Sequence, residues 1–130
     1  MQEPSIFTRI INGEIPCHKI YEDNRVIAFL DVHPLATGHT LVVPKVQVDH
    51  LWDLAEDDYD YLWKVSKKIA LHIRETIKSP RVGVIVDGFG VPHAHIHLIP
   101  IYTGRDIMGG HDQSEPDNAA LEKVAKQLRM

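Results

Sequence analysis

Three histidines alternate with apolar residues near the middle of the second half of the chain, and this pattern constrains the fold more than any other. The run reads His93-Ala-His95-Ile-His97-Leu-Ile-Pro. Successive side chains of a β-strand point to opposite faces, so the spacing predicts a strand over residues 93–101 with three imidazoles on one face. The other face carries only apolar side chains, which predicts that it is covered by the core of the protein.

The three imidazoles are expected within about 14 Å of one another along such a strand. Rings this close cannot all be charged at low cost, so at least one should have a lowered pKa and act as a neutral nucleophile or acceptor. A second interpretation is a metal site among His93, His95, His97 and His39, because His-x-His on a strand supplies two ligands. No carboxylate or cysteine stands at an evident complementary spacing, which weakens this interpretation.

The rest of the chain predicts one α+β domain over residues 1–130, with a mostly antiparallel sheet of about five strands. Apolar residues at three- and four-residue intervals predict one long helix over residues 55–78. Short terminal helices are expected at 5–12 and 117–129, and an irregular surface segment at 102–116. The remaining strands are expected at residues 19–21, 25–32, 39–44 and 81–87.

Composition excludes several classes of protein. The formal net charge of −4 argues against non-specific nucleic-acid binding, which needs positive charge. A single cysteine, Cys17, cannot form an internal disulfide and fits a reducing compartment. We find no signal-peptide pattern and no apolar run of the ~20 residues that a membrane helix needs. The sequence therefore predicts a cytoplasmic protein without nucleic-acid or membrane partners.

The histidine run resembles the signature of the histidine triad (HIT) family, in which three histidines alternate with apolar residues. Two other blocks, at residues 6–16 and 29–45, resemble the family's N-terminal and central segments in the same order. The resemblance implies the HIT-like fold, a homodimer joined edge to edge, and a purine nucleotide as the ligand. It also implies hydrolysis of nucleoside 5′-phosphate derivatives, either phosphoramidates or dinucleoside polyphosphates, through a covalent nucleotidyl-histidine.

The resemblance also implies roles for individual residues. His95 would attack the α-phosphate, His97 would stabilise the phosphoryl oxygens, His93 would orient His95, and His39 would support the triad. Asp31 would accept hydrogen bonds from the ribose hydroxyls. Ile6, Phe7, Ile10, Phe29 and Val32 would wall the base pocket, with simple core packing as the alternative for Phe7 and Phe29. Independently of the resemblance, backbone N–H groups at Gly90 and Val91 are candidate donors to the phosphate, since glycine permits close approach.

The third histidine bears on the type of reaction. Nucleotidyltransferases of the wider superfamily carry glutamine where His97 stands, so His97 favours water as the final acceptor. A catalytically weak nucleotide-binding protein stays open as an alternative. The reason is the loop at residues 86–92, which is shorter than in many members and lacks their asparagine and Gln-Ser pair.

Many bacterial members also hold a structural zinc with two N-terminal cysteines and two histidines. Ser5 and Thr8 stand at the cysteine positions here, and hydroxyls are poor zinc ligands. His50 stands at a position that resembles one histidine ligand. We therefore expect no required cofactor and no metal site.

Overall fold

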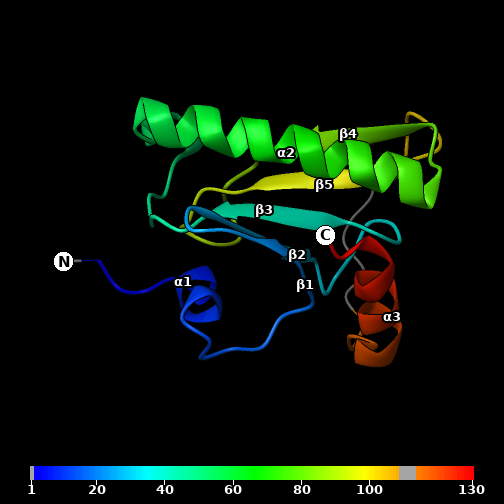
Figure 1. The fold of residues 1–130 in the computed structure, drawn as a ribbon, viewed down its shortest axis with the longest axis horizontal. Helices are drawn as coiled ribbons and strands as arrows, with labels where there is room; N and C mark the ends of the chain where they lie inside the picture. Colours follow the sequence, from blue (N-terminus) through cyan, green and yellow to red (C-terminus); the bar gives the residue numbers. More distant parts are fainter. Residues whose placement is uncertain (1, 109–113) are drawn as a thin grey trace.

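One antiparallel sheet organises the protein (Figure 1). The computed structural model describes residues 2–108 and 114–130. The sheet has five strands in the order β1-β2-β3-β5-β4, and every neighbouring pair is antiparallel. This confirms the predicted α+β architecture. The strands are β1 Lys19–Glu22, β2 Val26–Leu30, β3 Thr40–Pro44, β4 Arg81–Ile85 and β5 Ile96–Ile101.

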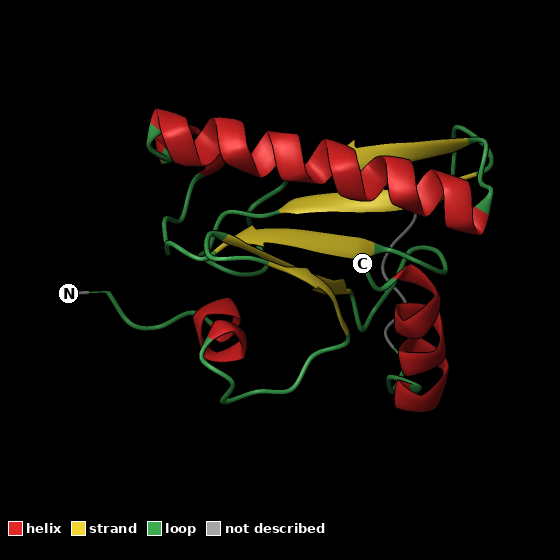
Figure 2. Ribbon diagram, viewed as in Figure 1, coloured by secondary structure: helices red, strands yellow, loops and turns green. Residues whose placement is uncertain are grey.

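The helices cover the sheet unequally (Figure 2). The long helix α2, Glu56–Ile77, runs beside the strands and contacts β3, β4 and β5. The helix α3, Asn118–Leu128, packs against α2, β1 and β2. The short helix α1, Ile6–Ile11, lies apart from both and follows Ser5, which accepts a hydrogen bond from the Thr8 N–H as its N-cap. A 3₁₀ turn, η1 Leu51–Asp53, was not expected from the sequence.

The two faces of the sheet belong to two separate apolar cores. In β2, Ala28 and Leu30 join the core under α2 and α3, whereas Ile27 and Phe29 join a smaller core that includes Phe7 of α1. All residues of β2 and β3 are buried, as a continuously apolar central strand requires. The face toward α1 therefore has its own buried wall, and this wall also forms part of a cavity.

The last strand begins later than the sequence predicts. β5 starts at Ile96 and not at residue 93, because the preceding backbone bonds elsewhere. The His93 N–H donates to the Val91 carbonyl at 2.8 Å, and the Ala94 N–H donates to the Val48 carbonyl at 2.7 Å. Residues 93–95 thus form a hydrogen-bonded segment immediately before β5. The other predicted ends lie within two residues of the observed ones, and some coincide with them.

The predicted alternation across residues 93–98 survives this irregular start. Ala94, Ile96 and Leu98 lie in the core under α2. His97 pairs with Leu41, which belongs to the core toward α1, so the histidine side of the run faces α1.

Two surface features bear on the sequence-based expectations. β4 forms one edge of the sheet and leaves Val84 half-exposed, and edge-to-edge pairing of two copies stays a prediction. In the described part of segment 102–116, residues 102–108 and 114–116 contain neither helix nor strand; residues 109–113 lie outside the described residues. Among the described helices, none is both long and apolar enough to cross a membrane.

Gly38 lies in the turn that leads into His39 and the start of β3. Its φ is +94°, in the left-handed region that side chains rarely adopt. A Cβ at this position would lie 3.3 Å from Pro100 Cγ and 3.4 Å from Ile77 Cγ1. Gly38 therefore satisfies a conformational and a steric requirement together, directly before His39.

We expect Gly38→Ala to destabilise the protein by about 2–3 kcal/mol, because strain and a tight contact add. Gly13 is the matched control, since its φ is +79° but the methyl group of an alanine there would meet no atom within 4 Å. Gly13→Ala should cost only ~1 kcal/mol. Urea unfolding measures both; equal costs would contradict the steric part of this explanation.

Candidate active site

A cavity of about 540 Å³ opens on the side of the sheet that faces α1. Its wall is apolar where α1, β2 and β3 meet, and polar where the β4–β5 loop and the histidines reach it. The lining residues are Ile6, Phe7, Ile10, Pro16, Cys17, Phe29, Leu30, Asp31, Val32, His33, Leu41, Asp87, Gly90, Val91, His95 and His97.

The structure brings together nearly all the residues that the sequence singled out. Every residue expected to bind the nucleotide lines this cavity, as do His95 and His97. His93 and His39 do not line it; both are buried, and each is hydrogen-bonded to one of the two lining histidines. Phe7 and Phe29 combine two roles, because each is packed in the smaller core and also lines the cavity.

Sequence reasoning missed several lining residues. Asp87 is the one with a charge, and its only sequence signal is its place just before the glycine loop. Leu41 could have been found from strand pairing, because it stands opposite Phe29 on one side and His97 on the other. The other missed lining residues are Pro16, Cys17, Leu30 and His33.

The proton on His95 is placed by the backbone. His95 Nδ1 lies 2.7 Å from the carbonyl oxygen of His93. A carbonyl oxygen only accepts, so Nδ1 carries the proton and Nε2 keeps its lone pair. The ring is buried and in edge contact with Phe7, with centroids 4.9 Å apart. Burial lowers the pKa of His95, so the neutral ring is favoured.

His93 is held at both ring nitrogens. Its Nε2 lies 2.7 Å from the Pro44 carbonyl oxygen and must donate to it. In the neutral ring Nδ1 then accepts, and the Ser5 hydroxyl lies 2.7 Å away as the donor. Burial lowers the pKa of His93 as well, and His95 beside it acts in the same direction. This agrees with the expectation that closely spaced imidazoles do not all become charged.

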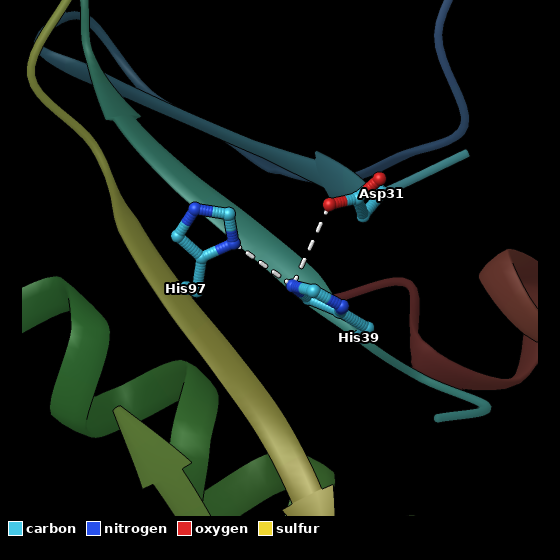
Figure 3. Close-up of side chains that lie close together, drawn as sticks. All are labelled: Asp31, His39 and His97. Atoms are coloured by element: carbon cyan, nitrogen blue, oxygen red, sulfur yellow. Dashed lines mark hydrogen bonds and ion pairs between the residues drawn. The ribbon is translucent and has the colours of Figure 1, made fainter. Parts of the chain in front are cut away.

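A second chain of hydrogen bonds places the proton on His97. The Leu35 N–H donates to His39 Nδ1 at 3.0 Å, so the neutral His39 ring carries its proton on Nε2. His39 Nε2 lies 2.9 Å from His97 Nδ1 and donates to it (Figure 3). His97 therefore carries its own proton on Nε2. Asp31 Oδ2 lies 3.5 Å from His39 Nε2 and supports its orientation.

The same cluster offers three ligand atoms to a metal ion, but its hydrogen bonds oppose one. One ligand atom from each of Asp31, His39 and His97 lies within 4.8 Å of the others. A metal ion there would need the lone pair of His39 Nε2, which would move the ring proton to Nδ1. That proton would face the Leu35 N–H, so a metal ion there would cost the hydrogen bond from Leu35 to His39. The hydrogen bonds of this cluster therefore disfavour a metal ion at these three residues.

The residues near the N-terminus do not fit a structural zinc either. Ser5 and Thr8, which stand at the expected cysteine positions, lie together beside His93, but they bring hydroxyls where thiolates are expected. The fourth residue is Gln47 and not His50, because the Gln47 amide oxygen accepts from the Ser5 N–H and the Thr8 hydroxyl. His50 lies largely exposed beside Asp49. Two hydroxyls and an amide make a hydrogen-bonded cluster and a poor zinc site.

The charge of the cavity is negative. Asp31 and Asp87 both line it, and no lysine or arginine belongs to its lining within residues 2–108 and 114–130. Both carboxylates favour the positively charged form of His95, although burial outweighs them in setting its pKa. The site thus combines a neutral nucleophilic nitrogen with carboxylates that stabilise positive charge on the same ring.

The comparisons with known proteins agree on one family. A family model described as "HIT domain" matches residues 12–104. A hypothetical histidine triad nucleotide-binding protein from Sulfolobus tokodaii has a solved structure with a TM-score of 0.84 and 31% identity, covering 95% of this chain and 88% of that one. A zinc-bound histidine triad family protein from Mycobacterium smegmatis has a TM-score of 0.75 and 27% identity, covering 95% and 94%. The Arabidopsis thaliana adenylylsulfatase HINT3 is 32% identical over 98% of this chain and 67% of its own length.

The lowered pKa values of His93 and His95 predict how stability depends on pH. The unfolded protein binds more protons near the ordinary value of 6.5 than the folded protein does. The stability from these groups is therefore present above pH 6.5 and lost as the pH falls through the lowered values. Thermal unfolding between pH 8 and pH 5 should show this loss.

The His95→Asn variant should lose less stability between pH 8 and pH 5 than the natural protein. His50→Gln is the control, because it also removes one histidine, but from an exposed position outside the cavity lining. Identical acid dependence in all three proteins would contradict the assignment.

Proposed function

Because the chain belongs to the HIT domain family, whose members bind nucleotides and include hydrolases, we propose that it hydrolyses nucleoside 5′-phosphate derivatives at the α-phosphate. The observation that carries the proposal is the hydrogen bond from His95 Nδ1 to the His93 carbonyl. It leaves the Nε2 lone pair of a buried, neutral imidazole as the nucleophile beside the cavity.

The first step forms a bond between His95 Nε2 and the α-phosphorus and breaks the bond from phosphorus to the leaving group, which takes a proton from solvent. His97 donates its Nε2–H to a phosphoryl oxygen and stabilises the charge that develops there. The substituted His95 ring becomes positively charged. The His93 carbonyl and the carboxylates of Asp31 and Asp87 favour that charge.

The second step returns the enzyme to its starting state. Water attacks the phosphorus, the bond to Nε2 breaks, and Nε2 recovers its lone pair while a proton leaves to solvent. The products are the nucleoside monophosphate and the free leaving group. Neither proposed step requires a metal ion.

The cavity supports a nucleotide as the ligand. Its apolar wall, formed by Ile6, Phe7, Ile10 and Phe29, suits a purine ring, which is flat and apolar on its faces. The Asp31 carboxylate is the acceptor for the ribose hydroxyls. The backbone N–H groups near Gly90 and Val91 are the donors for the phosphate, whereas Pro92 has none to give.

The charge of the cavity favours one class of substrate over another. A polyphosphate leaving group would bring further negative charge toward Asp31 and Asp87 without a lysine or arginine in the described lining to compensate. An amine leaving group is neutral or positive. We therefore propose a nucleoside phosphoramidate as the preferred substrate and a dinucleoside polyphosphate as the poorer one.

His95→Ala should abolish formation of a covalent adduct. Adenosine 5′-phosphoramidate mixed briefly with the natural protein, with EDTA present and quenched without acid, should add the mass of one AMP. The variant should add nothing, yet should bind AMP with a Kd similar to that of the natural protein. Binding of AMP by the natural protein without any adduct or turnover would overturn the proposal and favour a nucleotide-binding protein.

Asp87→Asn should change the choice of leaving group. Removing this charge should raise kcat/KM for diadenosine triphosphate by about two- to fivefold relative to an adenosine phosphoramidate with a cationic amine. Asp53→Asn is the control, because Asp53 is exposed and outside the cavity lining. An unchanged ratio between the two substrates in Asp87→Asn would show that cavity charge does not select the leaving group.

A further inference from the structure

We infer that Ser5 is a positioning residue for the nucleophile, acting through His93 on His95. The inference rests on the proposed function for its kinetic consequences, but its structural part concerns the ring of His95 alone. Ser5 lies 88 residues before His93 in the chain, and its side chain is buried against it. Neither step of the proposed hydrolysis uses this hydroxyl.

The direction of the Ser5 hydroxyl follows from its neighbours. Its oxygen accepts a hydrogen bond from the Thr8 N–H at 3.0 Å, which caps α1. Its proton has two acceptors in reach, His93 Nδ1 at 2.7 Å and Thr8 Oγ1 at 3.3 Å. The shorter contact is the stronger one, and His93 Nδ1 needs a donor because its Nε2 already donates to Pro44. Ser5 therefore donates to His93.

Gln47 keeps Ser5 in that position. The Gln47 amide oxygen accepts from the Ser5 backbone N–H at 2.9 Å and from the Thr8 hydroxyl at 2.6 Å. The Gln47 amide nitrogen donates to the Glu3 carbonyl at 2.7 Å. Because the Thr8 hydroxyl gives its proton to Gln47, it does not compete as a donor to His93. Each hydrogen bond of this cluster therefore has an assigned donor: the Ser5 N–H and the Thr8 hydroxyl donate to Gln47, and the Ser5 hydroxyl donates to His93.

The effect of Ser5 reaches His95 through the backbone of His93. With both ring nitrogens bonded, His93 is fixed between Ser5 and Pro44, and its carbonyl is fixed with it. That carbonyl is the acceptor that determines which nitrogen of His95 carries the proton. Loss of the Ser5 hydroxyl would leave a buried ring nitrogen without its donor and allow the His93 ring to turn.

The same serine links the triad to the wall of the base pocket. It caps α1, which carries Ile6, Phe7 and Ile10, all in the cavity lining. The Phe7 ring stands 5.9 Å from the His93 ring and 4.9 Å from the His95 ring, centroid to centroid. Hydroxyls and an amide thereby join α1 to the histidines at the positions where the family resemblance implies a metal.

The test compares three variants in single-turnover adduct formation with adenosine 5′-phosphoramidate. Ser5→Ala removes both the cap and the donor, and Ser5→Thr keeps both while adding one methyl group. Asp117→Ala is the matched control, because Asp117 caps α3 in the same way, accepting from the Ala120 N–H at 3.1 Å, and lies outside the cavity of His95.

Ser5→Ala should slow adduct formation at saturating substrate by about 10- to 100-fold, with KM changed by much less. Ser5→Thr should restore most of the rate, and Asp117→Ala should lower the Tm without slowing the reaction. Equal rates in Ser5→Ala and Asp117→Ala would overturn the inference, because Ser5 would then be only a helix cap.

A measurement on the uncomplexed protein separates this inference from the proposed function. Nitrogen-15 NMR of the histidine rings should show one dominant tautomer of His95, with the proton on Nδ1, and a mixture of tautomers in Ser5→Ala. An unchanged tautomer in Ser5→Ala would overturn the inference even if the protein is an active hydrolase. Absence of any adduct in the natural protein would instead overturn the proposed function, and the tautomer comparison would still decide the role of Ser5.

Discussion

The hydrogen bond from His95 Nδ1 to the His93 carbonyl is the interaction on which the rest of the site depends. Such a bond is possible because residues 93–95 precede the regular ladder of β5. In a regular strand the side chain of a residue does not reach the carbonyl two positions earlier, because that carbonyl pairs with a neighbouring strand. Because residues 93–95 lie outside the regular strand, the His93 carbonyl accepts from His95 Nδ1 and thereby leaves Nε2 as the nucleophilic nitrogen.

Backbone groups that can act only as donor or only as acceptor determine the tautomers of all four clustered histidines. The carbonyls of His93 and Pro44 only accept, and the Leu35 N–H only donates. From these three groups follow the protons on His95 Nδ1, His93 Nε2, His39 Nε2 and His97 Nε2. Burial lowers the pKa of His93 and His95, which favours the neutral form of these two rings. The fold thus determines which nitrogen of each neutral ring carries the proton.

Much of this site could be predicted from the sequence, since alternation and apolar periodicity are local. His95, His97, Asp31 and the apolar wall around Phe7 all line one cavity, as expected. The start of β5 could not be predicted, because it depends on a hydrogen bond from Ala94 to Val48, far away in the chain. The sequence also could not show that Gln47, and not His50, lies beside Ser5. Both residues are polar, and only the three-dimensional path of the backbone determines which side chain points inward. Asp87 was missed because a carboxylate before a glycine turn is common in loops without a site.

The most direct test of the proposed chemistry is to identify the nitrogen that carries the phosphoryl group. Adduct trapped from adenosine 5′-phosphoramidate can be studied by phosphorus-31 NMR, which distinguishes Nδ1-linked from Nε2-linked phosphohistidine, with peptide mapping to assign the residue. We predict a single linkage at Nε2 of His95, because Nδ1 is occupied by the His93 carbonyl. A linkage at Nδ1, or at His93 or His97, would contradict the proposed role of the His93 carbonyl.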